Sequence, residues 1–159
     1  MNPEELESEL LSFSGTENWY RHPFGIVYTD GVQFLAEQAQ AYWLIDAIAS
    51  HQHTAKVRRE PFQVWTLQVG VDRAPTKAEQ RLVDAGGAVF ISRANRANPQ
   101  QLEVIQLLKP TAAVLTGDDG DKGDGALVLA RQNIPYTDFQ LPFVKLYLED
   151  GCLMLPGEH

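Results

Sequence analysis

Residues 28–53 combine a helical repeat of apolar positions with start signals at one end. Thr29 and Asp30 are residue types that cap helix N-termini, and they stand just before the repeat. The apolar positions that recur every three or four residues are Val32, Leu35, Ala36, Ala39, Trp43 and Ala47. This spacing predicts a central helix with one broad apolar face lying under a sheet. A break at Gln40, where the apolar face shifts, would divide it into two shorter helices.

The segments on either side of this helix carry helix, strand and turn signals. Asn2, followed by proline, predicts a short N-terminal helix, and the aromatic stretch 15–31 predicts a structured loop or an edge strand. Residues 62–69 alternate in the manner of a strand. Residues 112–116 and 126–134 flank an acidic, glycine-rich loop and therefore predict a hairpin.

The clearest hairpin signal lies at residues 144–156, where two leucine-rich runs flank Asp150 and Gly151. Asp-Gly is a preferred two-residue turn. This turn pairs Glu149 with Cys152 and collects four leucines on one face: Leu146, Leu148, Leu153 and Leu155. A half-buried antiparallel pair requires such a face, so the register is predicted together with the element.

Residues 70–110 have a different pattern and charge. A capping box at Thr76 predicts a helix over 76–86, residues 88–92 predict a short buried strand, and residues 99–109 predict a second helix. Six basic and four acidic residues make this segment positive, although the whole chain carries −8. We interpret it as an α-β-α unit inserted between two arms of a β-ribbon, 62–69 and 112–116, that pair with each other.

Together these elements predict a single α+β domain over residues 1–159. An antiparallel sheet, a meander with a C-terminal hairpin, packs on the central helix and carries the inserted unit. The length and the 44% hydrophobic content are ordinary for one globular domain with a real core.

The charge and cysteine content narrow the function. A net charge of −8 argues against general binding of nucleic-acid phosphates, which depends on clustered Lys and Arg. The single cysteine, Cys152, excludes an internal disulfide and a multi-cysteine zinc site, and no neighbour would lower its pKa. The acidic opening and the lack of a long apolar run favour a cytoplasmic protein that does not interact with membranes. No pattern calls for a cofactor.

Candidate catalytic residues lie in and near the aromatic stretch. His22 together with Asp30 or Asp138 would supply a general acid and base, as in a small hydrolase-like enzyme. Both aspartates also fit as caps or turn formers, and the chain has no nucleophile motif or glycine-rich phosphate loop. The sequence therefore favours a non-enzymatic protein over this alternative.

Candidate metal ligands occur in two places. His51 and His53 stand at the end of the predicted central helix, where two residues apart means diverging directions unless the helix frays. Asp119 and Asp121 belong to the acidic loop, whose spacing lacks the order of a calcium-binding EF-hand. Contact with the helix dipole and a solvated turn account for these residues without a metal.

Six strings of the sequence occur together in a recognisable order: GTENWYRHP, YTDGVQFLAEQA, AYWLIDAIASHQ, FQVWTL, IPYTDF and VKLYLEDGCLMLP. The chain thereby resembles an uncharacterised domain-of-unknown-function family of short bacterial and mobile-element proteins. The resemblance covers residues 10–69 and 111–157, implies a shared fold and brings no activity with it. Two departures are the insertion and the ending PGEH, where relatives close with Pro-Ser-Glu and an aromatic residue.

The favoured hypothesis is a non-enzymatic protein-interaction module. The inserted unit would bind a protein partner or close a homodimer, with Arg93, Arg96, Leu102 and Ile105 as contact residues, because new surface at a hairpin end disturbs the core little. The mobile-element character of the resembled family makes a phage- or plasmid-borne modulator or inhibitor of a host defence protein a natural variant. Nucleic-acid binding through the basic insertion is a further alternative, less expected for an acidic chain.

Overall fold

The computed structural model describes residues 1–69, 81, 89–94, 102–107, 112–120, 127–141 and 143–159. Its helices are α1 (Pro3–Leu11), α2 (Asp30–Gln38), α3 (Tyr42–His51), α4 (Ala55–Arg58) and the 3-10 turn η1 (Pro156–Glu158). Its strands are β1 (Trp19–Arg21), β2 (Val27–Thr29), β3 (Phe62–Val69), β4 (Val89–Ala94), β5 (Leu102–Leu107), β6 (Ala113–Asp118), β7 (Val128–Ile134), β8 (Phe143–Glu149) and β9 (Cys152–Met154).

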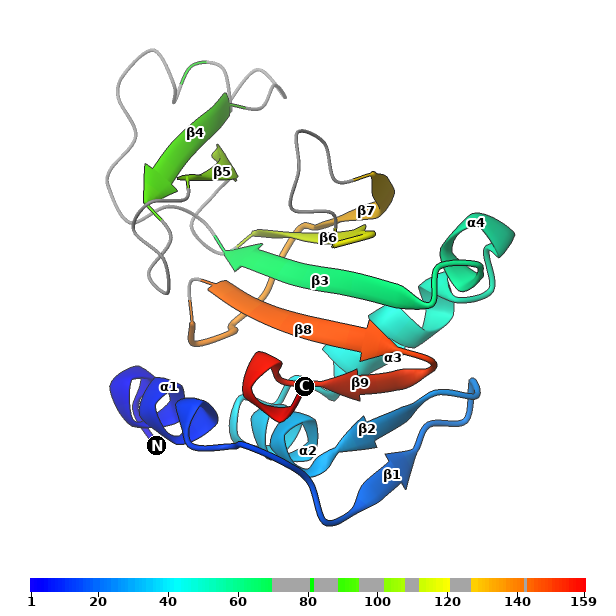
Figure 1. The fold of residues 1–159 in the computed structure, drawn as a ribbon. Coiled ribbons are helices and arrows are strands. Elements are labelled where there is room, and N and C mark those ends of the chain that lie inside the picture. Colours follow the sequence, from blue (N-terminus) through cyan, green and yellow to red (C-terminus); the bar gives the residue numbers. More distant parts are fainter. Residues whose placement is uncertain (70–80, 82–88, 95–101, 108–111, 121–126, 142) are drawn as a thin grey trace.

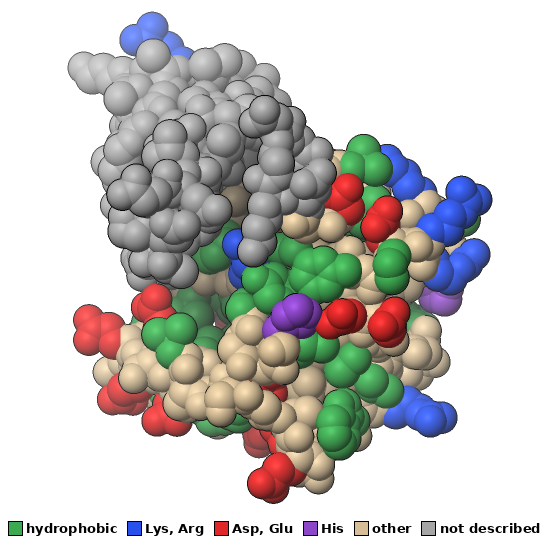
Figure 2. Space-filling view, in the orientation of Figure 1, with side chains coloured by type: hydrophobic (Ala, Val, Ile, Leu, Met, Phe, Trp, Pro, Cys, Tyr) green, Lys and Arg blue, Asp and Glu red, His purple; other side chains and the backbone are tan. Residues whose placement is uncertain are grey.

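Seven of the strands form one open sheet in the order β1-β2-β9-β8-β3-β6-β7. All neighbours in it are antiparallel except β2 and β9, which run parallel. Helix α3 lies behind the sheet in the view of Figure 1. The opposite face, turned toward the viewer in Figure 2, carries hydrophobic side chains near its centre. The predicted α+β class is confirmed.

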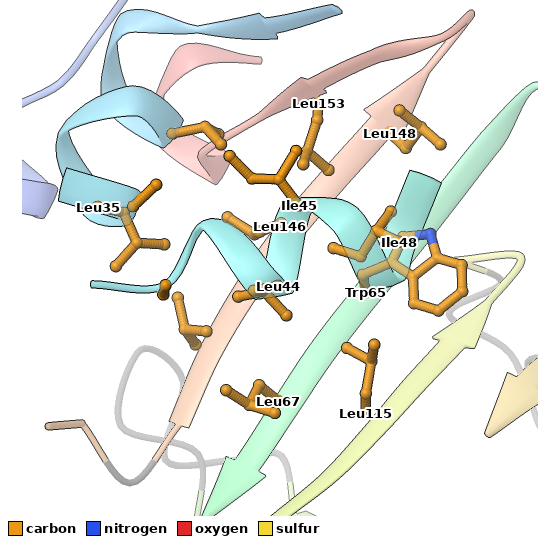
Figure 3. Close-up of a cluster of buried hydrophobic side chains, with 14 of the residues drawn as sticks. Leu35, Leu44, Ile45, Ile48, Trp65, Leu67, Leu115, Leu146, Leu148 and Leu153 are labelled. Atoms are coloured by element: carbon orange, nitrogen blue, oxygen red, sulfur yellow. The ribbon is translucent and has the colours of Figure 1, made fainter. Parts of the chain in front are cut away.

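The core lies between α3 and the sheet. Ile48 of α3 has no exposed surface, and it packs in the cluster that contains Trp65 of β3 and Leu146 of β8, each 1% exposed. Figure 3 shows these side chains pointing toward one another from the helix and from the strands. The strict alternation of β3 explains the arrangement, because it directs every second side chain to the helix-covered face.

The central helix is divided as the sequence allowed. Gln40 takes a positive φ of 51°, and this left-handed residue separates α2 from α3. Thr29 caps α2 as predicted, because its hydroxyl accepts a hydrogen bond from Val32 N at 3.4 Å. The Asn2 cap of α1 is also confirmed and forms a reciprocal capping box with Glu5.

The C-terminal hairpin has the predicted register. Glu149 pairs with Cys152 and Leu148 with Leu153, across a turn in which Asp150 and Gly151 both have positive φ. The four leucines expected on one face are all buried. The fourth, Leu155, lies beyond the end of β9 but keeps its inward position.

The two arms around the insertion pair directly, as predicted. Val69 and Ala113 are Cα partners in the β3–β6 ladder. The predicted strand at 88–92 is confirmed over 89–92 as part of β4, which pairs with β5 in a separate two-stranded sheet. Of the predicted helix 76–86 only Arg81, which is helical, lies in the described part.

The second helix of the inserted unit, predicted over 99–109, is wrong where the structure describes it. Residues 102–107 are strand β5, antiparallel to β4, so the unit is not α-β-α. The run LEVIQL suits either structure by its apolar spacing, but the β-branched pair Val104 and Ile105 favours a strand. Pairing with β4, which no local pattern reveals, decided between them.

Candidate functional site

A cleft of about 560 Å³ opens at one end of the sheet, where four connections meet. Its walls come from the β1–β2 turn at Phe24, the end of α3, the α4–β3 connection and the β8–β9 turn at Asp150. These connections lie together on the right side of Figure 1. The volume is within the range of about 300–1,000 Å³ that ligand pockets occupy. This cleft is our candidate site.

Two hydrogen-bonded glutamines, buried Gln63 and half-buried Gln52, form part of the cleft lining. Gln63, 2% exposed, donates from Nε2 to Gln52 Oε1 at 2.9 Å and to Val57 O at 2.8 Å. Gln63 Oε1 accepts from Gln52 Nε2 and from Trp65 Nε1, both at 2.9 Å. Because an unpaired buried amide is costly, this network fixes α3, α4 and β3 relative to one another.

His22 fastens the exposed wall of the cleft to α3. Phe24 is 52% exposed, and its backbone N donates to His22 Nδ1 at 3.0 Å. The other ring nitrogen, Nε2, lies 2.7 Å from Asp46 Oδ1. Because Nδ1 accepts, the ring proton of neutral His22 resides on Nε2 and is donated to the carboxylate. The Phe24 ring also contacts His53 edge-on, with 5.3 Å between centroids.

Two guanidinium groups, those of Arg58 and Arg59, stand at the mouth of the cleft. Both side chains are exposed, and neither forms an ion pair with a carboxylate of the described residues. This holds although Glu60 and Asp150 line the same cleft. Figure 2 shows Lys and Arg gathered along the right margin of the molecule, while acidic side chains gather at the lower left.

The three catalytic candidates do not share a hydrogen-bond network among the described residues. His22 is bound to Asp46 and to the Phe24 backbone, as described above. Asp30 accepts hydrogen bonds from Glu17 N at 2.9 Å and Asn18 N at 3.1 Å. Asp138 is exposed. Asp46, the partner that His22 has instead, is 24 positions away in the sequence, and no spacing rule pointed to it.

The environment of Asp30 is that of a structural carboxylate. The backbone hydrogen bond from Glu17 holds the pKa of Asp30 below its usual value, with further help from Asn18. Tyr20 donates to Asp30 Oδ1 at 3.1 Å, and that bond raises the pKa of the Tyr20 hydroxyl. Asp30 therefore connects residues 17–20 to the start of α2 through hydrogen bonds.

The candidate metal ligands that the structure describes have different surroundings. His51 is half-buried, stacks on Trp65 with 5.3 Å between ring centroids, and has Nε2 2.8 Å from Gln132 Oε1. His53 is exposed beside Phe24. Asp119 Oδ1 accepts from Leu127 N at 3.0 Å, and Asp121 lies outside the described residues. Within the described ranges no three His, Cys, Asp or Glu residues gather as a metal site would require.

The predicted contact residues of the insertion that the structure describes lie on β4 and β5, and their positions are given as Cα partners in the ladder between these strands. Arg93 of β4 is the Cα partner of Glu103 on β5, and Ile105 of β5 is the Cα partner of Ile91. Leu102 begins β5, and Arg96 lies outside the described residues.

The C-terminal segment contains a contact that sequence reasoning missed. Glu158 Oε1 accepts from Thr29 Oγ1 at 2.6 Å, and Oε2 accepts from Gly31 N at 3.1 Å, so the carboxylate sits at the N-terminus of α2. The ring of His159 contacts Phe62 and Tyr147 at 5.4 Å each, which is the packing that an aromatic residue would provide.

The surroundings of the single cysteine, Cys152, contain no group that lowers the pKa of its thiol, which agrees with the expectation from the sequence. Burial raises the pKa of Cys152, and Glu158 and Glu149 raise it further. A thiol with a raised pKa carries little thiolate at neutral pH and is a poor nucleophile.

The molecule is therefore an α+β protein with an open, mainly antiparallel sheet and a cleft at one sheet end. The chain belongs to the family of unknown function DUF6876, whose model matches residues 4–94 and 82–159. No curated protein and no solved structure matches the chain. In the part of the chain that the structure describes, no helix combines the length and the apolar character that crossing a membrane requires.

Proposed function

We propose that this protein is a non-enzymatic protein-interaction module whose inserted unit, residues 70–110, binds a partner protein. One feature of the topology supports the proposal. Strands β4 and β5 pair with each other, and among the described residues neither pairs with a strand of the seven-stranded sheet. The rest of the chain, residues 1–69 and 111–159, is called the frame below. The β3–β6 ladder of the frame brings together the two chain ends between which the unit is inserted. Figure 1 shows the two strands beyond the end of β3.

The physical argument concerns unsatisfied strand edges. A two-stranded ribbon is marginally stable by itself and needs a further strand or a packed element. Each outer edge of the β4–β5 ribbon lacks a strand partner among the described residues, so it presents backbone donors and acceptors. Strand addition by a partner satisfies such groups, and side chains on alternate positions then provide specificity.

The enzyme alternative has less support. A general base needs a ring nitrogen free to take a proton from substrate. Both ring nitrogens of His22 already have partners, at 2.7 Å and 3.0 Å, and the one that accepts a hydrogen bond is the one facing the Phe24 backbone. This arrangement suits a residue that positions a turn.

The decisive experiment removes the unit without opening the frame. Because Val69 and Ala113 are Cα partners, an Asn-Gly turn can replace residues 70–112 and close β3 and β6 into a hairpin. Affinity purification from the native host would compare this variant with the full chain. Trp19→Ser, which removes a 60% exposed aromatic side chain from β1, is the matched control on the frame.

We expect the main partner to disappear with the shortened variant and to remain with Trp19→Ser. An unchanged partner list for the shortened variant, with its melting transition intact, would place recognition on the frame and refute the proposal. If the partner is a second copy, light scattering will show a dimer for the full chain and a monomer for the variant. A role as a phage- or plasmid-borne modulator of a host defence protein would follow from the identity of the purified partner.

The nucleic-acid alternative makes a separate prediction. Binding through the basic insertion requires salt-sensitive retention of DNA or RNA that is lost when Arg93 and Arg96 are replaced by glutamine. A gel shift at low salt measures it, and we expect none, because the net charge of −8 opposes a polyanion.

A further inference from the structure

We infer that the cleft at the sheet end is a second binding site, on the frame and independent of the insertion. Its ligand is a short acidic peptide segment of a partner protein. One carboxylate of the segment pairs with Arg58 and Arg59, and an adjacent apolar side chain packs on Phe24.

The first argument is the state of the two arginines. Arg58 and Arg59 stand at the end of the short helix α4, whose backbone is held in place, since the neighbouring Val57 is 1% exposed and its carbonyl accepts from buried Gln63. A guanidinium group presents paired donors that match a carboxylate. Because the guanidinium group is planar and its donors are already arranged, less side-chain entropy is lost for each hydrogen bond that forms on binding. Both groups lack an ion pair with the described carboxylates. A ligand carboxylate is the missing complement.

The second argument is the exposed aromatic wall. Phe24 is 52% exposed, and its position is fixed by edge-on contacts with His22 and His53 at 5.1 and 5.3 Å between centroids. The hydrogen bond from its backbone N to His22 Nδ1 holds the turn that carries the ring. The ring lies in the same cleft as two cations that lack an ion pair among the described residues, which suits a ligand with an apolar side chain beside an anionic group.

The third argument separates a peptide carboxylate from a polyanion. Glu60 and Asp150 line the same cleft. A nucleic-acid strand would bring several phosphates past these carboxylates and meet a net charge of −8. A single carboxylate that pairs with the two arginines meets less of that repulsion than a row of phosphates does. The backbone N–H groups of an extended peptide can also donate to Glu60 or Asp150.

The test uses the full-length protein and a phage-displayed library of random dodecapeptides, followed by fluorescence polarisation with the enriched peptides. The variants are R58Q/R59Q, which removes both charges, R58K/R59K, which keeps charge but not the guanidinium fork, and Phe24→Ala. Arg21→Gln is the control, because Arg21 is an exposed arginine of β1 that does not line the cleft. A labelled oligothymidine of twenty nucleotides is measured in parallel. Circular dichroism confirms that each variant is folded.

We expect enriched peptides in which Asp or Glu stands beside an aromatic or large aliphatic residue. R58Q/R59Q should weaken their binding about ten- to a hundredfold, R58K/R59K and Phe24→Ala each by about tenfold, and Arg21→Gln by less than about twofold. Replacing the peptide's acidic residue with its amide should reproduce the loss.

Three outcomes would overturn the inference. They are a selection that yields no acidic consensus, peptides that bind R58Q/R59Q as well as the wild type, and tighter binding of the oligonucleotide than of any peptide with the same dependence on the arginines. The variants change residues of the frame only, so a failure here leaves the proposed function of residues 70–110 standing.

Discussion

Replacing Glu158 with alanine tests how far the C-terminal turn secures α2. The carboxylate accepts from Thr29 Oγ1 at 2.6 Å, from Leu155 N at 3.0 Å and from Gly31 N at 3.1 Å. Thr29 is only 2% exposed, so its hydroxyl cannot regain a partner from bulk water without rearrangement. The variant also removes a negative charge from the N-terminus of α2, where the helix dipole favours it.

The size of the effect follows from these contacts. A hydrogen bond to a charged group contributes about 1.5–3 kcal/mol, and a charge at a helix terminus about 0.3–1 kcal/mol. Because Glu158 is partly exposed and its contacts share one carboxylate, the contributions overlap, and we expect a total loss of about 2–3 kcal/mol. In a chain of this size, 1 kcal/mol lowers Tm by about 2–4 °C. The expected decrease in Tm is therefore about 4–12 °C.

Thermal melts and urea unfolding followed by circular dichroism would measure this loss. Glu158→Gln should fall between the wild type and Glu158→Ala, because it keeps one acceptor oxygen but not the charge. Glu9→Ala on the exposed side of α1 is the matched control and should change stability by less than about 0.5 kcal/mol. If Glu158→Ala melts within about 2 °C of the wild type, the C-terminal turn does not secure α2 and the reasoning is wrong.

Three further predictions concern Ile48 of α3, Asp118 of β6 and Asp30 at the start of α2. Ile48→Ala, at a fully buried position of α3, should lower the free energy of unfolding by about 2–5 kcal/mol in urea titrations. Burial raises the pKa of Asp118 above its unfolded value, so its ionised form opposes folding above that pKa; Asp118→Asn should raise Tm at pH 7 and leave it unchanged at pH 3. The pKa of Asp30 is lowered by backbone hydrogen bonds, first from Glu17, so its contribution is present above the unfolded pKa near 3.8 and lost as the pH falls through the folded pKa. Asp30→Asn should therefore be less stable than the wild type at pH 7, and melts at decreasing pH should show the difference shrinking; a constant difference would contradict this account.

The C-terminal hairpin and the divided central helix were accessible from the sequence because their signals are local. Asp150-Gly151 selects a turn, the turn sets the register, and the alternation of leucines then assigns the buried face. Likewise, the shift of the apolar face near Gln40 indicated the break that a positive φ there provides. The pairing of β3 with β6 followed from treating residues 70–110 as an insertion.

The cleft could not be predicted from local sequence signals in this way. Its floor joins Gln52 to Gln63, its wall depends on the pairing of His22 with Asp46, and its rim includes Asp150 from the C-terminal hairpin. Each residue type is common, and no motif links positions so far apart. Arg58 and Arg59, at the end of α4, belong to no sequence motif that would mark a binding site.

The glycine of the YTDG string shows the same division between local and long-range information. Gly31 does not need a positive φ, so no turn rule explains it. A side chain there would clash with Glu158 and come within 2.6 Å of Leu155 Cδ1. The requirement for glycine comes from a residue more than a hundred positions away.

The sequence by itself determined α1, α2 and α3, most strands, the C-terminal register and the acidic net charge, because each depends on residue types and not on contacts between distant segments. Only the tertiary structure decided that residues 102–107 are a strand, that β2 runs parallel to β9, and that the glutamines and arginines meet at one sheet end. Those outcomes depend on contacts between distant segments, whose free energy outweighs local preference and leaves no periodic trace in the chain.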